Sequence, residues 1–204
     1  MVESRRSREK QQRRELLLGA AASVFGRRPF DEATMQEVAT EAQIGMQGLY
    51  EHFSSKQELY EQVMLVRGET FRTRVDAALE GVTDPLAQIR ILATVHVQQF
   101  RDQPMFLPLF IRDRVHFDWG FSSRFGDRIH QIYDGERRRL RHIVERLVEG
   151  GVFRPLEIDF LVQVCLNLIE ASLYHSHRNH PGEEVTMCVD RAMDCLLQGL
   201  GVRA

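Results

Sequence analysis

The hydrophobic side chains of residues 34–56 repeat with the period of a helix. Two runs each share one apolar face: the first is Met35, Val38, Ala39 and Ala42, and the second is Leu49, Tyr50 and Phe53. Positions i, i+3, i+4 and i+7 lie on one side of a helix, so each run predicts a short helix. The segment 43–45 breaks the repeat between them. Two helices joined by so short a turn form a helix-turn-helix unit.

Polar residues mark where the helices of this stretch begin. Thr34 precedes the first apolar run and is followed three positions later by Glu37. Ser55 and Glu58 repeat the same spacing after the second run. A Ser or Thr with Glu three residues on is a capping box, in which each side chain binds the backbone amide of the other residue. We therefore predict that one helix starts after Thr34 and another after Ser55.

The remainder of the chain also reads as helix, because its apolar positions form helical stripes and no segment alternates as a strand does. The expected helices cover residues 8–26, 55–79, 85–101, 127–149, 158–174 and 183–200, and the third of these has Asp84 as its N-cap and Pro85 in its first position. The first has the apolar side Leu16, Leu17, Ala20, Ala21, Val24 and Phe25. We expect an all-α protein of about nine helices. Residues 1–54 form a three-helix helix-turn-helix domain, and residues 55–204 form a second helical domain.

Two of these helices are apolar over more of their circumference than a monomer surface requires. In residues 158–174 the polar side chains form one narrow stripe: Asp159, Gln163, Asn167 and Glu170. Residues 183–200 carry a similarly broad apolar stripe. A helix that is apolar on most sides must be covered on most sides. We therefore expect these helices to form the interface of a homodimer.

Large aromatic residues gather between Phe100 and Phe125. This segment holds six of the twelve phenylalanines and the single tryptophan, Trp119, among the helix breakers Pro104 and Pro108. Rings beside irregular backbone are typical of a lined pocket. Composition alone fits an aromatic-rich core equally well.

Charge is distributed unevenly although the net charge is only −2. Residues 1–14 contain six basic residues and two acidic ones, a local charge of +4. Such a segment is either a solvated tail or an arm that binds phosphates, and its place before a helix-turn-helix favours the arm. No secretory signal follows it, and no apolar run is long enough to span a membrane. We expect a cytoplasmic protein.

Motifs of enzymes and metal sites are missing from the sequence. The eight histidines include no HExxH motif and no pair at i, i+4, and the three cysteines, Cys165, Cys188 and Cys195, have no CxxC spacing. The sequence also lacks GxSxG, a P-loop and GxGxxG. We expect neither an enzyme, nor a cofactor, nor a metal ion, and we interpret the cysteines as small buried hydrophobic residues.

The segment Gly48-Leu49-Tyr50-Glu51-His52-Phe53-Ser54-Ser55-Lys56 resembles the signature of the TetR family of transcriptional regulators. The helix that begins after Thr34 also fits this family. The resemblance covers roughly residues 10–65 by motif. It implies a dimeric regulator, by default a repressor, with an effector pocket and a dimer interface in its C-terminal half. It also favours the pocket over the aromatic core between Phe100 and Phe125.

Roles in DNA binding follow from the unit and from the resemblance. The N-terminal part of the second helix of a helix-turn-helix enters the major groove. Gln47 can bind adenine through two hydrogen bonds, and Met46 suits a thymine methyl group. The resemblance implies phosphate contacts for Thr34, Tyr50 and His52, and for Lys56 in the first turn of the next helix. The residues expected to contact DNA are Arg5, Arg6, Arg8, Thr34, Gly45, Met46, Gln47, Gly48, Tyr50, His52 and Lys56.

Two positions depart from the family pattern. Gln43 stands in the turn where the family usually has glycine, so we expect a strained backbone there. Gly45 replaces the usual Ser or Thr cap and is a weaker cap. Neither departure removes the unit, and together they define the first residue of the reading helix only to within one or two positions.

The sequence therefore predicts a regulator that binds a palindromic operator as a dimer and is released by a small apolar or aromatic effector. The expected ligand-binding residues are Phe106, Phe110, Phe117, Trp119, Phe121, Asn167 and Glu170. The alternative is a helical protein that binds small molecules or lipids and whose DNA-binding module is vestigial.

Overall fold

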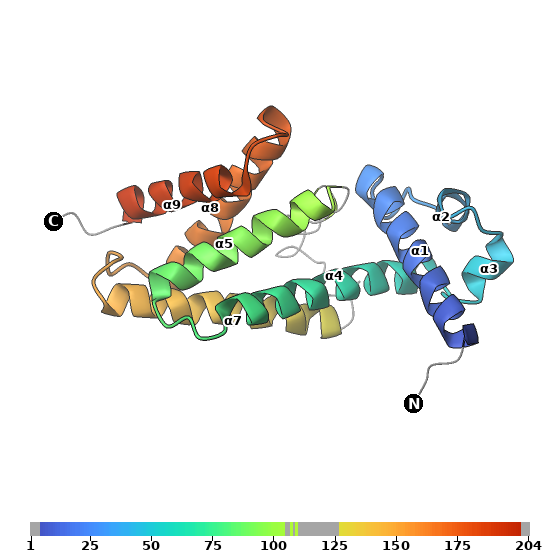
Figure 1. Cartoon of the computed structure of the whole chain (residues 1–204), viewed down its shortest axis with the longest axis horizontal. Coiled ribbons are helices and arrows are strands. Elements are labelled where there is room, and N and C mark those ends of the chain that lie inside the picture. Colours follow the sequence, from blue (N-terminus) through green and yellow to red (C-terminus); the bar gives the residue numbers. More distant parts are fainter. Residues whose placement is uncertain (1–4, 105–106, 108, 110–126, 201–204) are drawn as a thin grey trace. The chain divides into compact units, whose positions relative to one another are not determined.

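The computed structural model describes residues 5–104, 107, 109 and 127–200. In these residues it contains eight helices and no extended strand, which confirms the all-α prediction (Figure 1). The helices are α1 (Arg5–Arg27), α2 (Met35–Glu41), α3 (Met46–Tyr50), α4 (Lys56–Leu79), α5 (Pro85–Asp102), α7 (Asp127–Glu149), α8 (Ile158–Asn179) and α9 (Val185–Leu200).

The chain divides into two compact units. One comprises Met1–Gly68 and Gln103–His130, and the other comprises Glu69–Asp102 and Gln131–Ala204. The first division falls inside α4, whose opening turns belong to the N-terminal unit. The expected boundary between residues 54 and 55 marks the end of the helix-turn-helix motif, and it stays a prediction as a domain boundary.

The N-terminal unit has a small core in which aromatic rings from α1, α4 and the α1–α2 segment meet. The ring of Tyr60 on α4 lies 4.9 Å from that of Phe25 and 5.1 Å from that of Phe30, both edge-on. Phe53, which follows α3, is 1% exposed. Edge-to-face packing of this kind adds to the free energy of burial. The opening turns of α4 thereby complete the core that supports α2 and α3.

The predicted apolar face of α1 is rotated slightly from the observed one. Leu16, which we expected in the core, is 66% exposed, whereas Leu18 is 6% exposed. Leu17, Ala21 and Phe25 are fully buried as predicted. Both leucines border the central stripe, so periodicity does not decide between them. Leu16 lies on the side of α1 that carries Ser23 and faces the end of α2, where α2 leaves it uncovered.

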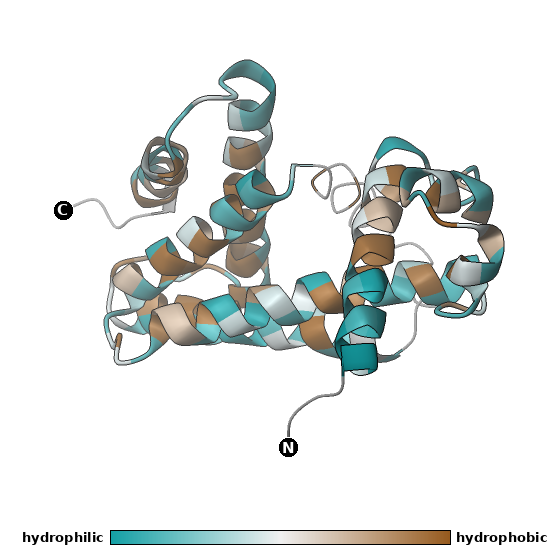
Figure 2. Cartoon of the chain, turned by 45° about the vertical axis from the view of Figure 1, so that its right-hand side comes forward, coloured by the Kyte–Doolittle hydropathy of each residue, from teal (hydrophilic) through white to brown (hydrophobic). Residues whose placement is uncertain are grey.

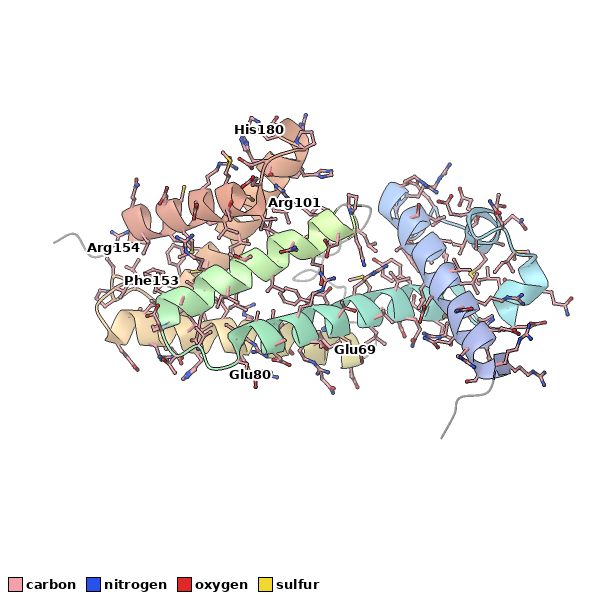
Figure 3. All side chains as sticks on the ribbon, in the orientation of Figure 1. Glu69, Glu80, Arg101, Phe153, Arg154 and His180 are labelled. Carbon is pink, nitrogen blue, oxygen red and sulfur yellow. The ribbon has the colours of Figure 1, made fainter. Side chains whose placement is uncertain are left out.

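The C-terminal unit is built from α5, α8 and α9, which pack on one another, and from α7 and the end of α4. Its buried side chains include Ile89, Val144, Leu147, Phe153, Leu161 and Leu196. Arg139 on α7 binds Asp76 on α4, and Arg74 on α4 binds Asp102 on α5 at 2.7 Å. Phe153 and Arg154 lie in the loop that follows α7 (Figure 3).

The cysteines only partly match the prediction. Cys165 and Cys188 are buried, and burial raises the pKa of the Cys165 thiol to about 12. A thiol with such a pKa is not a nucleophile at neutral pH. Cys195 is exposed, so its interpretation as a buried hydrophobic residue was wrong.

Helix ends follow the capping rules read from the sequence. The Asp84 carboxylate accepts a 2.7 Å bond from the Ala87 amide and caps α5 ahead of Pro85, as expected. Gly151 ends α7 with a positive φ of 69°. The amide of Val152 binds the carbonyl of Leu147 at 2.9 Å, which completes a Schellman motif.

α8 continues five residues beyond the predicted end at residue 174, to Asn179. Among the described residues no helix is long and apolar enough to cross a membrane.

Candidate nucleic-acid interface

The start of α2 has the predicted capping box. The Thr34 hydroxyl accepts a 3.2 Å bond from the Glu37 amide, and the Glu37 carboxylate accepts a 2.9 Å bond from the Thr34 amide. The Thr34 amide and hydroxyl both donate to the Glu37 carboxylate and lower its pKa, and the nearby Arg28 lowers that pKa further. The box is exposed, so it leaves the N-terminal end of α2 accessible to a phosphate.

Ion pairs attach α2 to α1 at both of its ends. Arg28 binds Glu37 at 3.1 Å, and Arg27 binds Glu41 at 2.8 Å. The Ser23 hydroxyl also donates to Glu41 at 2.8 Å. Each exposed pair contributes little on its own. Together they supplement the burial of Val38 and Ala39, which is the main force that holds α2 on α1.

Gln43 turns the chain between α2 and α3. It has a φ of +54° and is the one non-glycine residue with a positive φ in the described part of the chain. The Gln43 amide binds the Thr40 carbonyl at 3.1 Å, and the Ile44 amide binds the Ala39 carbonyl at 2.9 Å. These are the two bonds of a Schellman motif, whose left-handed position is usually glycine. The expected strained turn is confirmed.

Gly48 lets α3 approach the turn closely. A Cβ atom at residue 48 would lie 2.8 Å from the Cγ2 atom of Ile44, which is closer than carbon atoms normally come. Ile44 thus fills the space that a side chain on α3 would otherwise occupy. The sequence analysis listed Gly48 only as a DNA contact and missed this packing role, because the hydrophobic pattern does not show which residue lies against Gly48.

α3 exposes the side chains that were predicted to meet DNA. Gly45 is its N-cap, with no side-chain cap, and Met46 is its first residue. Gln47 is exposed, Met46 is half-buried, and Tyr50 is 52% exposed. Leu49 is fully buried and anchors the helix. The opposite faces of this short helix are therefore divided between core packing and solvent.

Cations of α1 lie near His52, which follows α3. Burial lowers the pKa of His52, and the charges of Lys10 and Arg13 lower it further. The basic segment is helical from Arg5 onward, so its described part is the start of α1 and not an extended arm. Figure 2 shows these hydrophilic first turns of α1. Lys10 and Arg13 are exposed and stand beside the motif, and sequence reasoning did not single them out.

The other cations of the segment divide between solvent and structure. Arg5, Arg6 and Arg8 are exposed on the first turns of α1, where Arg5 pairs with Glu9 at 2.9 Å. Arg14 lies 5.3 Å from the centre of the Phe53 ring and donates a 2.5 Å bond to Gln62 on α4. Arg14 is therefore committed to holding α1 against α4.

Lys56 opens α4, and its ammonium group points into the N-terminal unit. It donates to the carbonyls of Phe30 at 2.7 Å and of Ala33 at 2.8 Å. Just before it, the Ser55 hydroxyl accepts from the Glu58 amide at 3.1 Å, as predicted. The Glu58 carboxylate returns to the Ser54 amide at 2.7 Å, one residue earlier than in a capping box. Contact between Lys56 and DNA stays a prediction.

The predicted effector residues fall mostly outside the described residues. These are Phe106, Phe110, Phe117, Trp119 and Phe121. On α8, Asn167 is exposed and accepts a 3.0 Å bond from Gln163. Glu170 is half-buried, with its Oε1 atom out of contact with solvent. The two polar candidates therefore occupy different environments, and their contact with a ligand stays a prediction.

An exposed short helix that packs on the capped helix α2, beside a group of cations, is the arrangement of a helix-turn-helix DNA-binding regulator. Residues 17–63 match the family model of bacterial regulatory proteins of the tetR family. These residues form a DNA-binding domain of this family, and the chain is a DNA-binding transcriptional regulator.

Known proteins resemble the chain over most of its length. The nucleoid occlusion factor SlmA of Vibrio campbellii is 25% identical over 168 residues, which cover 82% of this chain and 84% of that protein. The ketosteroid transcriptional regulator KstR2 of Mycobacterium tuberculosis has a similar fold, with a TM-score of 0.76 and 20% identity over 100% of this chain and 98% of that one. AibR, solved with isovaleryl coenzyme A and operator DNA, has a TM-score of 0.74 and 18% identity, and the match covers 91% of this chain and 98% of that one.

Replacing Gln43 by glycine should stabilise the protein. Glycine adopts a positive φ without steric conflict, so Gln43→Gly removes a strain of about 1 kcal/mol, part of which is offset by the greater entropy of the unfolded chain. Urea unfolding should show a higher midpoint with an unchanged slope. The control Gln43→Ala keeps the strain and should not raise the midpoint. Equal midpoints for the two variants would contradict the prediction.

Operator affinity should rise as the pH falls toward 6, through His52. The free protein holds the pKa of His52 below 6.5, whereas a bound phosphate favours the charged imidazole and raises that pKa. DNA binding then takes up a proton, so affinity increases by up to about tenfold per pH unit for each protomer as the pH falls between the bound and the free pKa. Fluorescence anisotropy with operator DNA from pH 8 to 6 measures this. In His52→Gln the increase should shrink, and an identical pH profile would exclude His52.

Proposed function

We propose that the protein is a repressor that binds a two-fold symmetric operator as a homodimer. The observation that carries this proposal is the side of α3 that faces away from the core. Gln47 and Tyr50 are exposed there, while Leu49 is buried. A helix of five residues can contact only a few base pairs. A second copy of the motif, about one helical turn of DNA away, doubles the site that is read.

We assign different roles to the residues of the motif. Gln47 reads a base, since its amide can both donate and accept, and Met46 contacts a thymine methyl group. Gly45 and Gly48 keep the reading helix slim enough for its backbone to approach the groove. Phosphate contacts come from Thr34, Tyr50 and His52 and from the exposed cations of α1: Arg5, Arg6, Arg8, Lys10 and Arg13. Phosphate contacts position the protein but do not specify a sequence.

We assign the dimer interface to α8 and α9. α8 exposes Phe160 by 53% and Tyr174 by 47%, and α9 exposes Met187 by 57%. Positions 160, 164, 167, 171 and 174 follow each other at helical spacing, so Phe160 and Tyr174 belong to one stripe on α8. Large apolar side chains along one exposed stripe favour a protein partner. A second copy of the chain satisfies this and brings the two copies of α3 together.

We further propose that a small effector with an apolar part releases the operator. Phe106, Phe110, Phe117, Trp119 and Phe121 would line its site together with Asn167 and Glu170. A related fold binds isovaleryl coenzyme A, so a short acyl thioester is the first candidate to test. Such a ligand regulates only if it binds the released state more tightly than the DNA-bound state.

We also propose that the protein acts in the cytoplasm, where the genes that it regulates lie.

Selection from random duplex DNA tests the operator proposal. The wild type should enrich a two-fold symmetric motif and bind it with two protomers. Gln47→Ala should lose preference at one base pair of each half-site, at a cost of about 1–3 kcal/mol there. Gln12→Ala, which alters an exposed glutamine on α1 and leaves α3 intact, is the control and should select the wild-type motif. An unchanged motif with Gln47→Ala would remove this residue from the readers. No enriched motif for the wild type would favour the alternative of a vestigial DNA-binding module.

Thermal unfolding with candidate ligands tests the effector proposal. Isovaleryl coenzyme A should raise the melting temperature and weaken operator binding, whereas coenzyme A without the acyl group should do neither to the same extent. A ligand present at 100 times its dissociation constant stabilises by about 2.7 kcal/mol. If only small, highly polar ligands stabilise the protein, the apolar pocket is wrong.

A further inference from the structure

The ammonium group of Lys56 is surrounded by backbone carbonyls of the α1–α2 segment. Its Nζ atom lies 2.7 Å from the Phe30 oxygen, 2.8 Å from the Ala33 oxygen and 3.4 Å from the Asp31 oxygen. The same nitrogen lies 4.6 Å from the centre of the Phe30 ring, as in a cation–π contact. Lys56 on α4 is thus bound to a segment more than twenty positions earlier in the chain.

These contacts leave the ammonium group little capacity for DNA. A lysine has three N–H donors and no acceptor. Two of them make short bonds to carbonyls and the third is directed at the more distant one. A phosphate at this nitrogen would have to displace a carbonyl and leave that oxygen without its partner. In addition, a cation in the first turn of a helix is electrostatically unfavourable, and these carbonyls offset that cost.

The segment that Lys56 holds leads directly into the DNA-binding motif. Phe30 packs on Tyr60 of α4, so its ring and its carbonyl are both anchored to the same helix. The amide of Ala33 binds the Pro29 carbonyl at 3.0 Å, which makes the segment a compact turn. Ala33 is 1% exposed, and the next residue is Thr34, the exposed N-cap of α2. A displacement of the Ala33 carbonyl would therefore displace the N-terminal end of α2.

We propose that Lys56 is a positioning residue for DNA binding: its ammonium group ties the α1–α2 segment to α4 and so places Thr34 and the N-terminal end of α2 against a phosphate. Lys56 does not itself contact DNA. This inference rests on the proposed role of Thr34 in operator binding. It assigns the lysine that follows the motif to the interior of the unit, and the phosphate contacts to α2 and to the exposed cations of α1.

The dependence of operator affinity on salt distinguishes the two roles of this lysine. Lys56→Met keeps the apolar stem and removes the ammonium group. Affinity should fall about tenfold, while the slope of log affinity against log salt stays that of the wild type, because no phosphate contact is removed directly. Lys10→Met makes the same chemical change at an exposed position beside His52. It should reduce the magnitude of the slope by about 0.9 for each protomer. A reduced slope with Lys56→Met, or an unchanged affinity, would overturn the proposal.

A double-mutant cycle with Thr34→Ala separates positioning from a general loss of stability. If Lys56 acts through Thr34, the double variant should bind operator no more than about twofold more weakly than the weaker single variant. Independent losses that multiply would overturn the positioning role. Stoichiometric titration gives the fraction of each variant that can bind DNA, and affinities are corrected for this fraction. The slope of log affinity against log salt does not depend on it. If Lys56→Met does not fold, Lys56→Gln, which retains an N–H donor, is measured in the same cycle.

The wild-type protein, measured in the same assay, shows whether a negative result concerns Lys56 or the proposed function. Failure of the wild type to prefer any operator would count against the operator proposal alone. The slopes of Lys56→Met and Lys10→Met are then compared on duplex of arbitrary sequence, where phosphate contacts supply the affinity. The expected and the contradicting slopes are the same as on the operator.

Discussion

Helices α2 and α3 have seven and five residues, and this shortness is the constraint on which the rest of the DNA-binding unit depends. Helices of this length do not persist alone in water, because the cost of nucleation is spread over too few hydrogen bonds. Their geometry must come from their ends and from burial. The Thr34 capping box, the Gln43 turn and the fully buried Leu49 supply it.

The same constraint explains why α4 begins inside the DNA-binding unit. Tyr60 contributes a large buried ring to the core, and Lys56 holds the carbonyls of the preceding segment. The reading surface is consequently free of residues needed for stability. Gln47 and Tyr50 can face a ligand because Leu49 and Phe53 hold the helix from the other side. Charge follows a similar division: Arg14 binds within the unit, whereas Lys10 and Arg13 remain exposed.

Residues whose role depends on their immediate neighbours in the chain could be predicted. Thr34 with Glu37 and Asp84 with Pro85 cap helices as expected, because the partner lies within one turn of the same helix. Residues whose role depends on a distant partner could not. Leu16 is exposed and Leu18 is buried, because what covers each of them is set by tertiary packing and not by the helical period. Gly48 meets Ile44, and Lys56 meets the Phe30 carbonyl, and neither contact has a sequence signal.

By itself, the sequence determined the helical class, the position of the helix-turn-helix and its resemblance to the TetR family, since hydrophobic period and capping are local properties. It also indicated a surface for a partner on the helix that begins at Ile158, from the excess of apolar residues there. The tertiary structure decided which side chains of the motif face solvent and which are used internally. The physical reason is that a long, flexible side chain such as Lys56 can adopt many conformations, and the polar groups around it in the folded protein select one of them. Only the folded unit places three carbonyls within reach of its ammonium group.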